Sequence, residues 1–249
     1  MLATQRLERL AGELVFQAMS LPDEEYLTDL HLHTDYTDGR SGVAAMLDAA
    51  VAAGLRAVAF TEHVRRGVAW LPTFHAEVRR ERATRPGLRV LVGIEAKALD
   101  LYGGLDADEE AIASADLVLG AFHNYPDGLG GFVSPRELDA TTAAKREYEA
   151  SWALLEHAEV DVLAHPGALT RKKFGSFPDE LTRQLVRKAG RQGRAIELNG
   201  EYADADALAA LLRWCREEDV WVTLGSNAHH ADEVGRIGRM VKEVLAHAG

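Results

Sequence analysis

The chain has 249 residues, and 28 Lys and Arg against 39 Asp and Glu give it a net charge of -11 at pH 7. This acidic balance argues against nucleic acid or an anionic membrane as the default partner, so any bound anion requires a local positive centre. Apolar runs are much shorter than the roughly 20 residues of a membrane-spanning helix, and we expect no membrane partner.

Residues 1–26 are predicted to form a helical extension, and residues 27–249 a single barrel domain. Charged residues such as Arg6 and Glu13 interrupt the apolar residues near the N-terminus, which differs from a secretory signal. We therefore expect a cytoplasmic protein. The single cysteine, Cys215, is predicted to be a buried thiol on a helix face.

Continuous apolar runs follow the extension and alternate with helix-like segments such as Ala205–Glu218. Such runs are typical of strands buried on both faces of a parallel sheet. The predicted strands are Leu27–Leu32, Ala57–Thr61, Arg89–Ile94, Leu117–Phe122, Val160–Ala164, Arg194–Leu198 and Val220–Leu224. The pattern predicts an α/β fold in which seven strand–helix units close into a (β/α)-type barrel with an added N-terminal helix.

Histidines and carboxylates recur where the predicted strands end. In chain order they are His31, His33, Asp38, His63, Glu95, His123, His165 and His229, with Asn227 beside the last. The carboxyl ends of parallel strands share one mouth of a barrel, so these side chains are expected to converge. Imidazole and carboxylate without thiolate suit Zn, Mn or Fe, and the alternative is a structural histidine network.

The combination resembles one known family. It comprises HxHT at 31–34, TxH at 61–63, GxE at 93–95, the isolated His123, HPG at 165–167 and GSxAH at 225–229. These motifs resemble the PHP (polymerase and histidinol phosphatase) family over roughly residues 27–235. The resemblance implies a distorted, TIM-like, seven-stranded (β/α)7 barrel that holds two or three divalent metal ions and hydrolyses phosphate esters.

Carried over by position, the resemblance implies three ion sites. The first would comprise His31, His33, Glu95 and Asn227, and Glu95 would bridge to a second with His123 and His165. The third would comprise Asp38, His63 and His229. The implied nucleophile is a metal-bound hydroxide, with His229 and Asp38 as nearby catalytic candidates.

Two positions depart from the family pattern. Residue 227 is Asn where the family usually has Asp, and a neutral amide oxygen coordinates more weakly, so the first site is expected to be loose or empty. Position 62 is Glu where Asp is common, and its longer side chain is expected to shift the ring of His63.

Substrate contacts are predicted at Arg171, Lys97 and Asn124, the last of which begins a glycine-rich loop, Asn124–Pro135, read as a substrate lid or a plain surface loop. The leading hypothesis is a histidinol-phosphatase-like enzyme whose partner is a small phosphorylated metabolite. One alternative is a nuclease or cyclic-phosphodiester hydrolase, although the basic, aromatic track that binds single strands is missing from the sequence. The other is a non-catalytic metal-binding barrel, suggested by Asn227.

Overall fold

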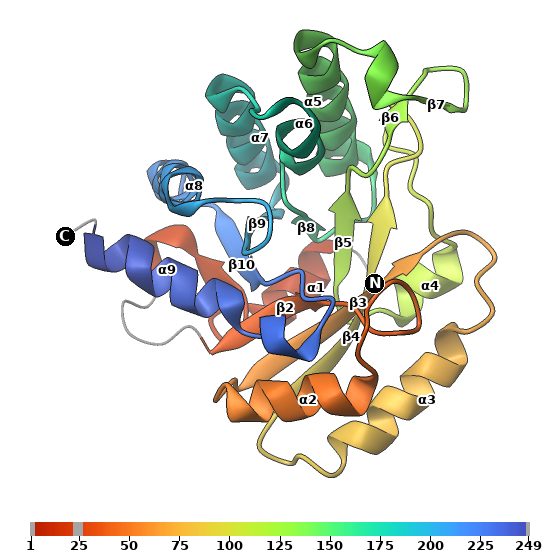
Figure 1. The fold of residues 1–249 in the computed structure, drawn as a ribbon, viewed down its shortest axis with the longest axis vertical. Coiled ribbons are helices and arrows are strands. Elements are labelled where there is room, and N and C mark those ends of the chain that lie inside the picture. Colours follow the sequence, from red (N-terminus) through yellow and green to blue (C-terminus); the bar gives the residue numbers. More distant parts are fainter. Residues whose placement is uncertain (1–2, 22–26, 248–249) are drawn as a thin grey trace.

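The computed structural model of this chain describes residues 3–21 and 27–247. A curled, mostly parallel sheet lies at its centre, and helices surround the sheet (Figure 1). The strands are β1 (Phe16–Gln17), β2 (Thr28–Leu32), β3 (Ala57–Val64), β4 (Arg89–Lys97), β5 (Val118–Ala121), β6 (Tyr125–Pro126), β7 (Phe132–Val133), β8 (Val162–Leu163), β9 (Ala195–Asn199) and β10 (Trp221–Gly225). Most of them are buried, as their apolar composition requires.

Helices follow most of the parallel strands. They are α1 (Ala3–Leu10), α2 (Val43–Ala52), α3 (Leu71–Arg82), α4 (Glu109–Ser114), α5 (Ala140–His157), α6 (Ala168–Phe174), α7 (Asp179–Gln192), α8 (Ala205–Glu217) and α9 (Arg236–His247), with short 3-10 turns η1 (Ala18–Ser20), η2 (Pro135–Glu137) and η3 (Ala231–Glu233). Each helix in the described ranges is too short or too polar to cross a membrane. Cys215 is buried in α8, as predicted.

The α/β fold with a parallel sheet is confirmed, but the predicted count of seven strands was too low. Within the described residues the main sheet has eight strands, in the order β1-β10-β9-β8-β5-β4-β3-β2. The additional strand is β1, in which Phe16 and Gln17 pair antiparallel with Val222 and Trp221. A two-residue strand is too short to give a periodic pattern, so the sequence did not distinguish it from the predicted helical extension.

The curl of the sheet brings β2 beside the segment that follows β10. A parallel bridge joins Leu32 to Ala228, and the backbone N–H of His33 donates to the Ala228 carbonyl at 2.9 Å. Earlier in β2, the buried Asp29 carboxylate accepts hydrogen bonds from the backbone N–H groups of Ser226 and Gly235, both at 2.8 Å. Burial raises the pKa of Asp29 to about 6. These bonds fix β2 to the segment that follows β10.

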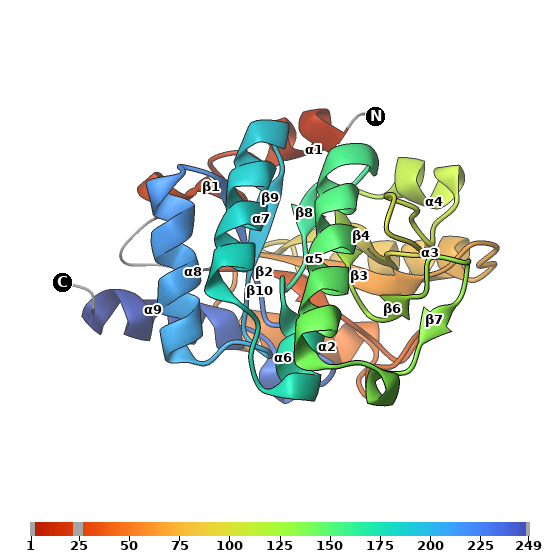
Figure 2. The same cartoon turned by 90° about the horizontal axis from the view of Figure 1, so that it is seen from above.

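The N-terminal segment closes the bottom of the barrel. Leu7, Leu10 and Leu14 pack into a buried cluster with interior residues such as Leu30 and Leu119. Figure 2 places α1 at the opposite end of the molecule from α6. The expected helix over residues 1–26 is corrected to Ala3–Leu10, while residues 1–2 and 22–26 lie outside the described chain, as do 248–249. The helix docks on its own sheet because its apolar face covers the open barrel end.

Glu147 of α5 anchors the helix that borders the barrel mouth. Its side chain is 1% exposed and accepts a hydrogen bond from the backbone N–H of Thr170, in the first turns of α6, at 2.8 Å. The Thr170 hydroxyl in turn lies 3.1 Å from the hydroxyl of Tyr125. Burial raises the pKa of Glu147 to about 7, so at higher pH a charged carboxylate is held in the interior.

We expect Glu147→Gln to stabilise the metal-free protein above pH 8, because the amide oxygen still accepts from Thr170 and carries no charge. Between pH 4.5 and 7 the folded wild type binds more protons than the unfolded chain, so its stability falls as the pH rises through this window. The wild type loses at most about 3 kcal/mol of unfolding free energy in this way. Denaturant unfolding of wild type and variant at pH 5 and pH 8 measures this loss, with Glu149→Gln on the same helix as control. Parallel pH profiles for Glu147→Gln and wild type would refute the prediction.

Candidate metal centre

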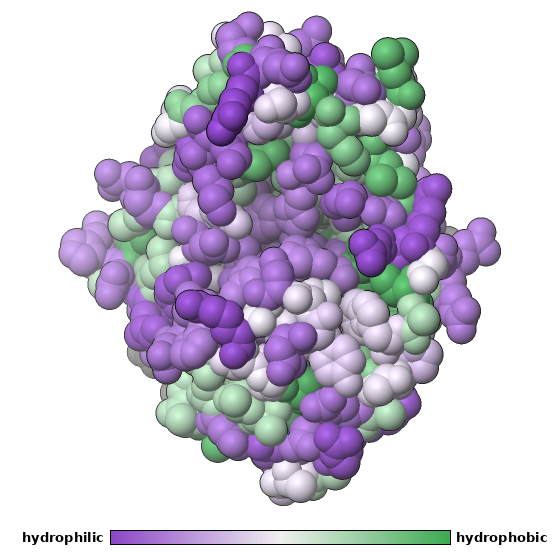
Figure 3. Space-filling view, turned by 45° about the vertical axis from the view of Figure 1, so that its right-hand side comes forward, coloured by the Kyte–Doolittle hydropathy of each residue, from purple (hydrophilic) through white to green (hydrophobic). Residues whose placement is uncertain are grey.

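The predicted ligands lie at the carboxyl ends of the parallel strands. His31 and His33 are two residues apart in extended chain, so both point to one side. His63 on β3 and Glu95 on β4 are direct neighbours in the ladder between these strands. Asp38 lies in the loop after β2, and the remaining ligands follow β5, β8 and β10. The space-filling view shows a hollow in this part of the surface with mostly hydrophilic surroundings (Figure 3).

Glu95 lies at the centre of the cluster and is 1% exposed. Its Oε1 is 3.0 Å from Nε2 of His165, 3.3 Å from Nε2 of His123 and 3.5 Å from Nε2 of His31. Its Oε2 is 2.8 Å from Nδ1 of His63 and 3.6 Å from Nε2 of His33. Burial opposes ionisation of Glu95, but the imidazoles outweigh burial and hold its pKa well below the usual range.

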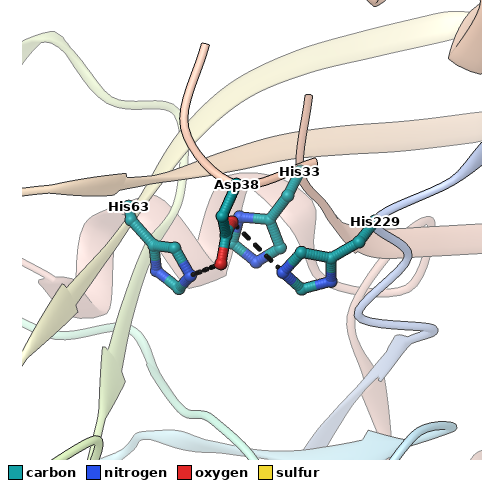
Figure 4. Close-up of side chains that lie close together, drawn as sticks. All are labelled: His33, Asp38, His63 and His229. Atoms are coloured by element: carbon teal, nitrogen blue, oxygen red, sulfur yellow. Dashed lines mark ion pairs between the residues drawn. The ribbon is translucent and has the colours of Figure 1, made fainter. Parts of the chain in front are cut away.

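A second group of ligands lies nearer to solvent (Figure 4). Asp38, whose side chain is 56% exposed, has Oδ2 at 3.4 Å from Nε2 of His63 and Oδ1 at 3.2 Å from Nε2 of His229. The ring of His33 stacks on those of His63 and His229 at centroid distances of 4.3 and 4.5 Å. His33 therefore borders both the inner and the outer group.

Hydrogen bonds fix which ring nitrogens face the centre. Nδ1 of His229 lies 2.9 Å from the backbone carbonyl of Asn227, which can only accept, so Nδ1 carries the hydrogen. Nδ1 of His31 likewise donates to the Glu197 carboxylate at 2.6 Å. When these rings are neutral, the lone pair of Nε2 points into the cluster. This is the arrangement that a neutral imidazole needs to bind a metal ion.

The environment of the cluster shifts the pKa values of its histidines in opposite directions. Burial, together with the neighbouring rings of His63 and His31, lowers the pKa of His33 well below its usual value. Burial also opposes protonation of His63, but the nearby Glu95 and Asp38 raise its pKa to about 10. Imidazoles packed this closely repel one another when protonated, whereas shared divalent cations satisfy their lone pairs and the carboxylates. The donor set therefore fits Zn, Mn or Fe.

The structure brings the predicted ligands together, but their grouping differs from the implied one. Ligand atoms within 4.8 Å of one another form the groups His31–His33–Glu95, His63–Glu95–His123 and His33–Asp38–His63–His229. His63 thus contacts Glu95 as well as Asp38, and His165 joins through Glu95. The division of the ligands into three ion sites stays a proposal.

His165 and Asn227 have left-handed backbones, with φ of 29° and 50°. Non-glycine residues rarely adopt this conformation, and strained residues of this kind cluster at functional sites. Asn227 places Oδ1 3.1 Å from Nε2 of His33, and its Nδ2 donates to the Glu201 carboxylate. Because a carboxylate can only accept from the amide nitrogen, Glu201 turns the amide oxygen of Asn227 toward the cluster.

Sequence reasoning missed Glu197, a buried carboxylate in β9. Its Oε1 binds Nδ1 of His31, and its Oε2 accepts from the backbone N–H of His165 at 2.7 Å. A Cβ on the facing Gly225 would lie only 2.0 Å from Oε1 of Glu197, so glycine is required at that position. The available signal was a carboxylate inside an apolar strand, which has to be paired when buried.

We expect Glu197→Gln to weaken metal binding roughly 10–100-fold, the usual effect of losing a carboxylate that orients a ligating histidine. Competition with a chromophoric chelator measures the affinity without reference to activity. Glu217→Gln, on the surface of α8, is the matched control. Unchanged affinity in Glu197→Gln would show that this carboxylate does not orient His31 for binding.

Glu62 does not act on the ring of His63 in the way its length suggested. Adjacent residues of a strand point to opposite faces, and Glu62 accepts instead from the Thr34 backbone N–H at 2.7 Å and from the Thr37 hydroxyl. Burial raises the pKa of Glu62 to about 7. The carboxylate thereby holds the loop that carries Asp38, and the expectation of a displaced ring is withdrawn.

Two hollows flank the cluster and share His123 and Asn124. A hollow of about 360 Å³, here called the aromatic hollow, is lined by Phe122, His123, Asn124, Tyr125, Val133, Pro135, His165, Ala168, Leu169, Lys172, Lys173 and Tyr202. The other, the polar hollow of about 480 Å³, is lined by Tyr36, Thr37, His63, Val64, Arg65, Val68, Trp70, Glu95, Lys97, His123 and Asn124. Both therefore open at candidate metal ligands.

Two predicted substrate contacts lie in these hollows. Asn124 lines both, and Lys97 lines the polar hollow, where its Nζ pairs with Asp106 at 3.2 Å. Arg171 lies elsewhere, in a cavity of about 40 Å³ that Asp179 and Glu197 also line. Successive residues of a helix point in directions about 100° apart, so Lys172 and Lys173 line the aromatic hollow in its place.

The glycine-rich loop Asn124–Pro135 contains a short antiparallel hairpin of β6 and β7. Val133 and Pro135 form part of the wall of the aromatic hollow, while Leu129 at the tip is 93% exposed. Asp127 caps the turn by accepting from the backbone N–H groups of Leu129 and Gly131. The loop therefore borders the candidate site, and its role as a lid stays a prediction.

The sequence matches one domain family and is similar to several named proteins. The model of the PHP domain matches residues 29–201. A protein of Acetivibrio thermocellus named "Probable phosphatase" is 30% identical over 226 residues, which are 88% of this chain and 86% of that protein. The DNA polymerase/3'-5' exonuclease PolX of Bacillus subtilis is 28% identical over 212 residues, 82% of this chain but 34% of that protein.

Among solved structures, a histidinol phosphate phosphatase of Lactococcus lactis has a similar fold. The two chains superpose with a TM-score of 0.69 at 16% identity, covering 89% of this chain and 93% of the other. That crystal structure contains zinc, L-histidinol and phosphate. At this identity the likeness concerns the fold alone.

Proposed function

We propose that this chain, which belongs to the PHP domain family, is a metal-dependent phosphoesterase that hydrolyses a small phosphomonoester. The observation that carries the proposal is the convergence of imidazoles on the buried Glu95 beside two hollows that open at the same ligands. The relative named as a phosphatase supports the reaction class. The Lactococcus lactis enzyme, crystallised with L-histidinol and phosphate, supports a small leaving group.

Divalent ions, when bound at this cluster, supply Lewis acidity, neutralise phosphate charge and activate water. His31, His33, Glu95 and Asn227 would hold the first ion. Glu95 with His123 and His165 would hold the second, and Asp38, His63 and His229 the third. Ions at these positions give an acidic protein a local positive centre for phosphate.

The chain's own residues fix the site and handle protons. Glu95 holds the inner imidazoles in place, and Glu197 and the Asn227 carbonyl orient His31 and His229. Asp38 and His229, on the more exposed side of the cluster, lie where a proton can be exchanged with solvent. Both are retained as catalytic candidates.

Phosphate release from small phosphomonoesters, histidinol phosphate included, tests the proposal. Metal-loaded wild type is compared with His165→Ala, which controls for a contaminating phosphatase. We expect the substitution to lower turnover by about 10³-fold or more, as loss of a central catalytic group does. A folded, metal-loaded wild type that releases no phosphate from any monoester would exclude the proposed reaction.

The match to the Bacillus subtilis exonuclease supports a second candidate, hydrolysis of nucleic-acid phosphodiesters. The net charge of -11 opposes it. Salt separates the two, because binding of a nucleic acid weakens steeply as salt rises, whereas a single buried phosphate group responds much less. KM values at 50 and 200 mM salt therefore distinguish a strand from a small monoester.

Asn227 motivates the third candidate, a barrel that binds metal without catalysis. Because Glu201 faces the Asn227 amide, we expect Asn227→Asp alone to give no gain in activity: its carboxylate would meet a like charge. Combined with Glu201→Gln, the same substitution should tighten binding of one ion roughly tenfold, since a charged ligand replaces a neutral one. An inactive wild type that Asn227→Asp alone converts into a strong phosphatase would favour the non-catalytic barrel.

A further inference from the structure

The aromatic hollow has a chemical character that narrows the substrate class. Its walls include the rings of Phe122, Tyr125 and Tyr202, and Tyr125 is almost fully buried. Leu169 adds a further apolar surface from α6. A cavity of about 360 Å³ is within the size range of small-molecule sites, which begins at roughly 300 Å³. The space therefore suits a flat or apolar group.

The hollow begins at the candidate metal centre. His123 and His165 line it and both contact Oε1 of Glu95. The ring of Tyr202 packs against that of His165 at a centroid distance of 5.3 Å. A phosphate held at the cluster would thus have the aromatic hollow within reach of its leaving group.

The ionic side chains at the outer wall of the hollow are cationic. Lys172 and Lys173 line it, and Nζ of Lys172 lies 5.1 Å from the centroid of the Tyr202 ring. Within residues 27–247, neither lysine has a carboxylate partner, and the hollow's lining includes no Asp or Glu. In the polar hollow, by contrast, Lys97 is paired with Asp106. The aromatic hollow therefore holds positive charge that is available to a ligand.

From this arrangement we infer that the aromatic hollow is the leaving-group site, and that it selects phosphomonoesters whose leaving group is aromatic or apolar and carries a second negative charge. The inference rests on the proposed function and specifies its substrate class. Lys172 and Lys173 bind the second anion, whereas a leaving group with an ammonium group, such as histidinol, is repelled by them. A carboxylate or a second phosphate meets the same chemical requirement.

A series of phosphorylated phenols tests the inference. The phosphates of 3-(4-hydroxyphenyl)propionate, 4-propylphenol and tyramine have similar shapes and leaving groups but negative, neutral and positive tails. Hydroquinone bisphosphate replaces the carboxylate by a second phosphate, which distinguishes the two sources of charge. We expect metal-loaded wild type to prefer the anionic tail over the neutral one by about tenfold in kcat/KM, and to turn over the cationic tail least.

The variant Lys172→Met with Lys173→Met is expected to abolish this preference through KM and leave kcat unchanged, as loss of uniform binding does. Its kcat/KM for the anionic substrate should fall to the value that it has for the neutral one, and a circular-dichroism spectrum matching wild type reports correct folding. Lys172→Glu with Lys173→Glu should reverse the preference toward the cationic tail. Lys145→Met, on the exposed side of α5, is the control.

The possible outcomes distinguish a wrong leaving-group assignment from a wrong proposed function. If wild type hydrolyses all of the series with similar kcat/KM, or if the double methionine variant keeps the preference for the anion, the leaving-group assignment is wrong and the phosphoesterase stands. If wild type prefers the cationic tail, the assignment is likewise wrong. If wild type hydrolyses none of the monoesters, histidinol phosphate included, the proposed function itself fails.

Discussion

Replacing Glu95 by glutamine is expected to lower kcat/KM for every substrate by about 10³-fold or more and to reduce the bound metal by at least one ion. Glu95 is the carboxylate that the inner imidazoles share, with oxygens 2.8 Å from His63 and 3.0 Å from His165. Glutamine keeps the shape but loses the charge. It also turns an NH2 group toward ring nitrogens whose lone pairs are needed for a metal ion.

Two measurements on the purified Glu95→Gln variant check this result, namely metal content by mass spectrometry and the rate of phosphate release. Glu109→Gln, at the exposed start of α4, makes the same chemical change away from the cluster and should match wild type in both. A Glu95→Gln variant that retains the wild-type metal content and turnover within tenfold would show that the cluster does not depend on a shared carboxylate.

Replacing Arg6 by alanine is expected to have the largest effect on stability, about 3–5 kcal/mol of unfolding free energy, which is the usual cost of removing one partner of a buried ion pair. Nε of Arg6 donates to Asp161 at 2.7 Å, and both side chains are at most 1% exposed. Nη2 of Arg6 also donates to the Glu159 carbonyl at 3.0 Å. Without Arg6, the buried Asp161 keeps its hydrogen bond from the Val118 N–H but loses its ion pair.

Urea unfolding of the metal-free protein measures this loss. Arg9→Ala removes an exposed arginine from the same helix and should change stability by less than about 0.5 kcal/mol. Adding Asp161→Asn to Arg6→Ala should recover part of the loss, because the buried charge is then gone. Equal stabilities for Arg6→Ala and Arg9→Ala would show that the buried ion pair of Arg6 with Asp161 does not stabilise the fold.

Sequence patterns predicted the parallel part of the fold because buried strands contain continuous apolar runs, such as Ala57–Phe60 at the start of β3. They failed where elements are too short to be periodic. Strand β1 has two residues and lies in a segment that charged and apolar residues made look helical. The β6–β7 hairpin lies within the glycine-rich loop, where the turn residues masked its two short strands.

The candidate ligands could be predicted because every parallel strand delivers its carboxyl end to the same mouth. What remained hidden depends on contacts between strands and on helix phase. Glu197 orients His31 only because Gly225 leaves space beside it, a relation that the register of β9 against β10 creates. The phase of α6 turns Arg171 away from the aromatic hollow and Lys172 toward it, and a short helix does not reveal its phase in sequence.

The most direct test of the central claim is phosphate release during a metal titration. The protein is stripped with a chelator, and its initial rate on a small phosphomonoester is followed as zinc or manganese is added in increments. We predict negligible turnover without metal and a rate that rises to a plateau between two and three equivalents. Full activity in the stripped protein, or no activity at any metal content, would contradict a phosphoesterase built on the Glu95 cluster.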